Sequence, residues 1–199
     1  MSKGSVQTWE RIVDGALIAL ARRGRYKFSM TDVCTESGVS RGTLYRYFAD
    51  KEDVIAAVEE RLETSFRDRL TTAIAERPEP ADRLEVVGAA IVQHQEEFPA
   101  LALLVRTEPG VVLERMSARF DALVALMQEC LHPALTQAEQ VQNGTVSEEQ
   151  IARIVVHCGI SLTCLPPNKS STAEEVTASL EGLLSLGSSA RESSKRHAN

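Results

Sequence analysis

The stretch VSRGTLYRYFADKED, residues 39–53, concentrates aromatic rings in a chain that is only 5% aromatic. Its centre, LYRYF, holds three rings and an arginine in five residues. On a helix with about 100° per residue, Leu44 and Phe48 point to one side, where they can pack against other helices. Tyr45 and Tyr47 fall on the two flanks, about 200° apart around the helix axis. The spacing predicts one buried ring and two rings with exposed hydroxyl groups.

The side of this helix opposite Leu44 is polar and narrow. Gly42, Thr43 and Arg46 span about 100° of its surface. Such a strip suits a helix in the major groove of DNA, where the centre meets base edges and the flanks meet phosphates. A tyrosine hydroxyl can donate to a phosphate oxygen, which a phenylalanine cannot do. Glycine at position 42 lowers helix stability by about 1 kcal/mol relative to alanine. Its lack of a side chain would let the helix backbone approach DNA closely, which explains why glycine is present here.

The residues before this stretch complete a helix-turn-helix motif. Residues 29–32, SMTD, predict a capping box at the start of a short helix over about residues 30–37. Gly38 ends this helix, and Ser40 caps a second helix over about residues 41–48. In a helix-turn-helix the second helix reads the bases.

The rest of the chain shows helical periodicity and no strand pattern of useful length, so we predict an all-α protein. Glycine, proline and asparagine punctuate the joins. The predicted helices cover residues 8–23, 30–37, 41–48, 51–77, 81–98, 101–106, 111–140 with a possible break at Pro133, 147–165 and 173–186. The tail 187–199, rich in serine and charge, is predicted to be disordered.

Charge is distributed unevenly along the chain. Residues 1–51, which we call the head, carry nine Lys and Arg against five acidic residues, a net charge of +4. The remainder carries 13 basic and 23 acidic residues, a net charge of −10. This asymmetry suggests that only the head meets a polyanion, although accidental surface charge remains the alternative.

Composition excludes several other classes of protein. Apolar residues make up 43% of the chain, and no apolar run approaches the roughly 18 residues of a membrane span. The first residues lack a signal peptide, so we expect a cytoplasmic protein that is not bound to a membrane. The four cysteines are scattered and are expected to be small core residues. Cys158, Cys164 and His157 lack further ligands at usable spacing, so we predict no metal and no cofactor.

Motifs for catalysis are missing from the sequence. The chain has no Gly-x-Ser-x-Gly elbow, no phosphate-binding glycine loop and no His-Glu-x-x-His helix, so we expect no enzyme. A second alternative is a helical protein-interaction module whose helix-turn-helix no longer binds DNA. The intact tyrosines and Lys51 argue against that alternative.

The strings SMTDV, GVSRGTLYRYF and DKEDV together resemble the DNA-binding domain of the tetracycline-repressor (TetR) family of bacterial regulators, over roughly residues 8–58. The resemblance implies a ligand-responsive transcriptional regulator, most often a repressor. It implies a helix-turn-helix DNA-binding domain of three helices over residues 1–51. A helical ligand-binding and dimerisation domain is implied over residues 52–186. The implied partners are a palindromic double-stranded DNA operator, a second copy in a homodimer and a small, apolar effector that releases the DNA.

The same resemblance implies which residues meet DNA. Those expected near base edges are Arg41, Gly42, Thr43 and Arg46. Those expected at the DNA backbone are Thr31, Tyr45, Tyr47 and Lys51.

Dimer and effector contacts are expected in the second domain. Apolar stripes on the last two helices are expected to pair with a second subunit, although they also fit packing within one chain. The stripes consist of Ile151, Ile154, Val155, Leu162, Val176, Leu180, Leu183 and Leu184. The residues expected to line an effector pocket are His94, Phe98, Leu101, Arg106, Met116, Phe120, Met127 and His157. By the resemblance, effector binding shifts the long helix that follows the head and changes the spacing of the two heads.

Overall fold

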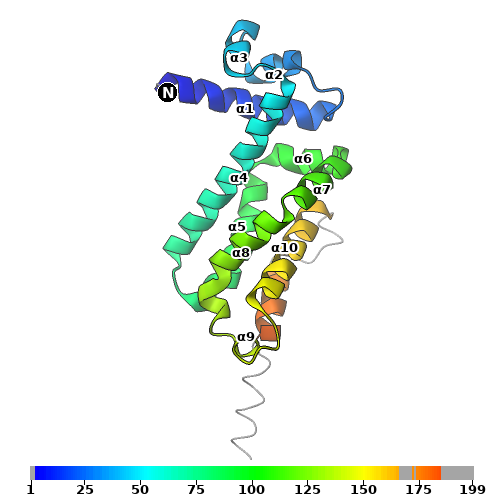
Figure 1. Cartoon of the computed structure of the whole chain (residues 1–199). Coiled ribbons are helices and arrows are strands. Elements are labelled where there is room, and N and C mark those ends of the chain that lie inside the picture. The colour runs from blue at the N-terminus through cyan, green and yellow to red at the C-terminus, as the bar shows by residue number, and fades with distance from the viewer. Residues whose placement is uncertain (1–2, 166–171, 173, 185–199) are drawn as a thin grey trace, which may run out of the picture. The chain divides into compact units, whose positions relative to one another are not determined.

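The computed structural model describes residues 3–165, 172 and 174–184, and within them it contains helices and no strand (Figure 1). The fold is all-α, as predicted. The helices are α1 (Lys3–Arg23), α2 (Met30–Ser37), α3 (Arg41–Tyr47), α4 (Lys51–Glu76), the 3-10 helix η1 (Pro80–Asp82), α5 (Arg83–Glu97), α6 (Pro99–Thr107), α7 (Pro109–Ala118), α8 (Phe120–Leu135), α9 (Glu139–Gln142) and α10 (Glu148–Cys164), followed by a helix over residues 174–184. No helix in the described ranges is long and apolar enough to cross a membrane.

The chain forms two compact units. Unit 1 combines residues 1–68 with residues 95–114, and unit 2 combines residues 69–94 with residues 115–199. Helices α4, α5 and α7 each contribute residues to both units. Unit 1 therefore contains the head together with the first part of α4 and all of α6. The functional boundary expected after residue 51 remains a prediction.

Unit 1 is built on the crossing of α1 and α2, which lie together with α3 and the first turns of α4 (Figure 1). Ile12 of α1, Val33 of α2 and Leu44 of α3 are fully buried in this core. Gly15 allows the close crossing, because a Cβ atom at this position would lie 2.6 Å from the backbone nitrogen of Ser37.

The predicted caps of the helix-turn-helix are present. The Ser29 hydroxyl accepts a hydrogen bond from the Asp32 amide, and the Asp32 carboxylate accepts one from the Ser29 amide, which makes a capping box. Gly38 ends α2 in the left-handed conformation with φ of 67°. Ser40 then caps α3 through the Thr43 amide, at 3.1 Å. Local side-chain chemistry therefore fixes the turn between the two helices.

Unit 2 is centred on α8 and α10, which run side by side (Figure 1). Met127 and Leu131 of α8 are buried, as are Ile151 and Val155 of α10. The Ser147 side chain and Gln150 form a second capping box at the start of α10.

Arg83, at the start of α5, is buried although it carries a charge, with only 7% of its surface exposed. Its Nη1 donates to the Cys130 carbonyl at 3.1 Å, and its Nη2 donates to the Pro78 carbonyl at 3.0 Å. Pro133 lies within α8 and has no N–H, so it cannot donate to the carbonyl of Glu129, the residue before Cys130. Through its hydrogen bond to the Cys130 carbonyl, Arg83 ties the start of α5 to α8.

Two predicted helix limits were wrong. The single helix expected over residues 111–140 is divided, because Arg119 has φ of −107° and ψ of 5° and separates α7 from α8. Pro133 lies in the last turns of α8 and does not break it, and the helix ends two residues later. At the N-terminus, α1 begins at Lys3 and not near Thr8, because no proline interrupts these residues and Gly4 is tolerated in an exposed first turn.

The cysteines also differ from expectation. All four are free and partly exposed, where small core residues were predicted. The predicted tail 187–199 lies outside the described residues, as do the ends of the helix predicted over residues 173–186.

We predict that Arg83→Met lowers the free energy of unfolding by about 2 kcal/mol, because it removes the two hydrogen bonds that the buried Arg83 guanidinium donates to backbone carbonyl groups. Urea denaturation followed by circular dichroism measures the change. Arg106→Met, at an exposed position of α6, is the matched control and should change stability by less than about 0.5 kcal/mol. Equal stability of the two variants would contradict a structural role for the Arg83 guanidinium.

Candidate nucleic-acid interface

Helix α3 turns its apolar side inward and its polar side to solvent, as its sequence predicts. Leu44 has no exposed surface and Phe48 is buried, whereas 56% of the Tyr45 surface is exposed. Gly42 and Arg46 are exposed as well. Anchoring at Leu44 therefore fixes which residues of α3 remain available to a partner.

The two tyrosines of α3 have different surroundings. Tyr45 projects into solvent, while Tyr47 is half-buried against the first turns of α1. The Tyr47 Oη lies 3.0 Å from the Ser5 Oγ, and it donates to the Ser5 carbonyl at 3.3 Å. The guanidinium of Arg46 lies over the Tyr47 ring, with the Cζ atom 5.5 Å from the ring centroid. Arg46 thus leans towards the Tyr47 flank of the helix.

The hydrogen bond from Ser5 is the main cause of a lowered pKa of the Tyr47 phenol. It stabilises the phenolate form, which makes the neutral phenol a better donor to an anion. Sequence reasoning missed Ser5 because the helix was expected to begin later in the chain. An α1 that starts at Lys3 brings this hydroxyl to α3.

The first turns of α2 and α3 meet through one side-chain contact. Arg41 Nη2 donates to the Thr31 Oγ1 at 2.7 Å, and both residues are exposed. Thr43 is half-buried, with its Oγ1 3.0 Å from the Ser40 Oγ. These residues form a continuous polar edge from α2 to α3.

Ion pairs neutralise the charge of some arginines in the head, while other arginines there have no acidic partner among the described residues. Arg22 pairs with Glu36 at 2.7 Å, and Arg23 pairs with Asp32 at 3.2 Å. Within the described part of the chain, neither of the two arginines of α3 has a carboxylate within 4.0 Å. The positive charge left in the head therefore includes the polar side of α3, where an anion would meet it.

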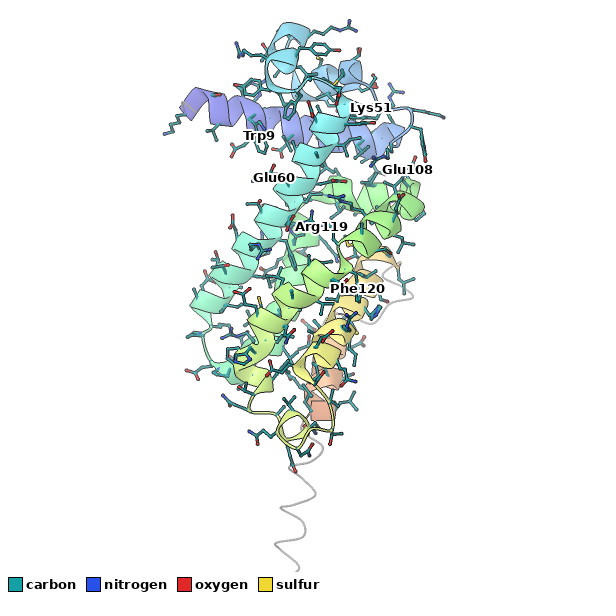
Figure 2. All side chains as sticks on the ribbon, in the orientation of Figure 1. Trp9, Lys51, Glu60, Glu108, Arg119 and Phe120 are labelled. Atoms are coloured by element: carbon teal, nitrogen blue, oxygen red, sulfur yellow. The ribbon has the colours of Figure 1, made fainter. Side chains whose placement is uncertain are left out.

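Lys51 begins α4, directly after the α3–α4 turn, and is half-buried (Figure 2). The Asp53 carboxylate accepts a hydrogen bond from the Ala49 amide at 3.0 Å, and the Asp50 carboxylate accepts one from the Asp53 amide at 2.9 Å. These two hydrogen bonds order the turn between α3 and α4, and so they hold Lys51 in place beside α3.

The residues expected at a dimer interface fall into two groups. Ile151 and Val155 are buried in the core of unit 2, so they are covered without a partner. Ile154 and Leu183 are large apolar residues that remain exposed, by 46% and 61% of their surfaces. The remaining four are half-buried: Leu162, Val176, Leu180 and Leu184.

The residues expected to line an effector pocket are divided between the two units. Unit 1 contains the buried Phe98 and Leu101 and the exposed Arg106. In unit 2, Met127 is buried and His157 is exposed. The other three residues of unit 2 are half-buried: His94, Met116 and Phe120.

One aromatic contact joins α8 to α10 among these residues. The rings of Phe120 and His157 lie 4.8 Å apart, and the Arg153 guanidinium lies 5.6 Å from the Phe120 ring. No three His, Cys, Asp or Glu side chains gather as metal ligands in the described ranges.

The contact between α1 and α6 also lies within unit 1 and was not expected from the sequence. The Thr107 Oγ1, at the end of α6, donates to the Ala21 carbonyl in the last turn of α1, at 3.2 Å. The same hydroxyl also lies 3.0 Å from the Leu103 carbonyl of its own helix, so the Ala21 carbonyl is one of the acceptors that share its proton.

Comparison with known proteins adds to this geometry. The model of the bacterial regulatory proteins of the tetR family matches residues 12–58. An uncharacterised HTH-type transcriptional regulator of Mycobacterium tuberculosis is 30% identical over 117 residues, which are 59% of this chain and 58% of that protein. The chain thus spans less than two thirds of that relative. The HTH-type transcriptional repressor LfrR of Mycolicibacterium smegmatis is 24% identical over 140 residues, 69% of this chain and 70% of the repressor.

A solved structure shares the fold. The fatty acid degradation regulator FadR from Bacillus halodurans has a TM-score of 0.68 and 18% identity, covering 88% of this chain and 93% of that one. The matched residues 12–58 include the capped helix-turn-helix of α2 and α3 and the start of α4. Residues 12–58 of this chain are thus similar to the bacterial regulatory proteins of the tetR family.

Proposed function

We propose that this chain is a DNA-binding transcriptional regulator that acts as a repressor in the cytoplasm. The observation that carries the proposal is the solvent-facing side of α3, which presents two arginines without a carboxylate partner in the described chain, flanked by tyrosines. A helix-turn-helix holds this side at a fixed angle. Such an arrangement matches the needs of a helix that enters the major groove.

The contacts divide by their place on α3 and beside it. Arg41, Gly42 and Thr43, at its start, are proposed to approach base edges, where they contribute to sequence preference. Arg46 is expected from the sequence at a base edge as well. The hydroxyls of Tyr45 and Tyr47 and the ammonium group of Lys51 are proposed to meet phosphates, and Thr31 a further part of the DNA backbone. Phosphate contacts position the protein without specifying sequence.

A single helix-turn-helix reads few base pairs, so two copies on a palindromic operator are proposed. The exposed Ile154 and Leu183 support a dimer, since large apolar side chains are rarely left in water without a partner. Leu162, Val176, Leu180 and Leu184 would be covered with them in the same interface. Ile151 and Val155 would support this surface from the core of unit 2.

A small, apolar effector is proposed to release the DNA. The phenylalanine, methionine and leucine side chains among the expected pocket residues suit an apolar ligand, and a histidine or Arg106 would orient one polar group. Helix α4 has residues in both units, so a ligand that changes its position changes the head as well. The ligand needs only to bind one conformation more tightly than the other.

Selection of genomic DNA fragments by the purified protein tests the proposed function. We expect enrichment of a palindromic sequence; a protein-interaction module would enrich none. On the selected fragment, Tyr45→Phe and Tyr47→Phe should each weaken binding about fivefold, because one hydrogen bond to a phosphate is worth about 1 kcal/mol. The preferred sequence should stay the same, because phosphate contacts carry no sequence information.

Tyr26→Phe is the matched control for these variants, since Tyr26 is the third tyrosine of the chain, is 86% exposed and lies outside α3. Its affinity should equal that of the wild type. A changed sequence preference in either α3 variant would contradict a phosphate contact.

For the dimer, we predict that Ile154→Glu raises the dissociation constant roughly thirtyfold, because burying an unpaired charge costs about 2 kcal/mol or more. Sedimentation velocity over a range of concentrations measures the change. Leu113→Glu is the control, because Leu113 in α7 is equally exposed, at 46%, and lies outside the proposed interface. If both substitutions leave the association unchanged, the apolar side of α10 is not the interface.

A further inference from the structure

A polar hollow lies between the first turns of α1 and the last turn of α3. Its volume is about 440 Å³, and it is lined by Gly4, Ser5, Thr8, Arg46 and Tyr47. A water molecule occupies about 30 Å³ in the liquid, so the hollow has room for a much larger polar group. All five residues belong to unit 1.

The chemistry of the hollow is that of hydroxyl groups and one cation. Ser5 and Tyr47 share the 3.0 Å hydrogen bond between their hydroxyl oxygens. The Thr8 hydroxyl donates to the Gly4 carbonyl at 2.8 Å, which holds it at the rim. The Arg46 guanidinium is held against the Tyr47 ring. No carboxylate is among the lining residues, so the charge of the hollow is positive.

A site of this composition selects a tetrahedral anion. Guanidinium and hydroxyl donors fit phosphate oxygens, and an arginine over an aromatic ring loses less conformational entropy when it binds. We propose that the hollow binds one phosphodiester of the DNA backbone, with Arg46 supplying the charge and Ser5 positioning the Tyr47 hydroxyl. The inference rests on the proposed function and adds α1 to the surface that meets DNA.

The hydrogen bonds at Ser5 explain how the site changes when it is filled. In the free protein the Tyr47 hydroxyl donates to the Ser5 carbonyl at 3.3 Å. When a phosphate enters, that proton turns towards a phosphate oxygen, while the Ser5 hydroxyl continues to donate to the Tyr47 Oη. A phenol that accepts one hydrogen bond donates a stronger one, since such chains are cooperative. The lowered pKa of the Tyr47 phenol agrees with this direction.

This assignment differs from the other roles proposed for these residues. Ser5 and Gly4 precede the matched residues 12–58, so the family match gives them no role. Arg46 is expected from the sequence at a base edge, where its loss would relax sequence preference. As a phosphate ligand, its loss weakens binding to every sequence equally. Loss of Arg46 therefore changes sequence preference if this arginine contacts a base, and leaves the preference unchanged if it contacts a phosphate.

Replacement of single phosphates by uncharged methylphosphonates tests the site. The probe is a duplex carrying the sequence selected by the full-length protein, with one phosphate replaced at a time. We expect one position in each half-site at which the replacement weakens the wild type about tenfold, the loss of one charge-assisted contact. At that position, replacement should cost the Arg46→Ala variant less than about twofold, and it should cost the Ser5→Ala variant, which keeps the Arg46 charge, less than it costs the wild type.

Ser5→Ala should also weaken binding to the unmodified duplex about two- to fivefold, no more than Tyr47→Phe does, with an unchanged preferred sequence. Ser5→Thr keeps the hydroxyl and should restore the methylphosphonate effect. Ser117→Ala, an exposed serine of α7, is the matched control and should behave as wild type. Thermal melting of each variant shows that it is folded.

Three results would overturn the inference. The first is a methylphosphonate profile that stays the same in Ser5→Ala and Arg46→Ala. The second is a changed sequence preference in Arg46→Ala, which would place this arginine at a base. The third is saturable binding of inorganic phosphate by the DNA-free protein, lost in Arg46→Ala, without a phosphate-specific effect on DNA; the hollow would then hold a free anion. If the wild type binds no duplex at all, the proposed function fails together with this site.

Discussion

Burial of Leu44 and Phe48 in the core of unit 1 is the constraint on which the functional surface depends. These two side chains fix the rotation of α3 about its axis. Every other residue of that helix is then either at its flank or towards solvent. A rotation of one residue, about 100°, would bury Tyr45 and expose Leu44, so the apolar contact determines where the arginines and hydroxyls lie.

The head extends beyond the helix-turn-helix at both ends of α1. At its start, Ser5 holds the hydroxyl of Tyr47; at its end, Ala21 accepts a hydrogen bond from Thr107 of α6. Residues 95–114 pack in the same unit as the head, mainly through α6 against α1, although they lie far from it in the sequence. A change at α6 therefore reaches α1 directly, and α1 carries one side of the polar hollow.

Local signals in the sequence were sufficient to predict much of the structure of the head. The capping box at Ser29, the left-handed Gly38 and the inward face of α3 follow from residue type and spacing, and all are present. Contacts between distant segments were not predictable in this way. The hydrogen bonds of Arg83 to two carbonyls and the end of α7 at Arg119 depend on packing that no local pattern reveals. Within the candidate site, the α3 residues were predicted, but the α1 side was not.

The salt dependence of DNA affinity tests the central claim most directly, namely that uncompensated positive charge on the outer side of α3 binds a polyanion. Arg46 and Lys51 in each of two heads neutralise at least four phosphates in this account. The plot of log K against log salt concentration should therefore have a slope of about −3.6 or steeper, at roughly −0.9 for each phosphate. A slope near zero, with binding intact, would contradict the account.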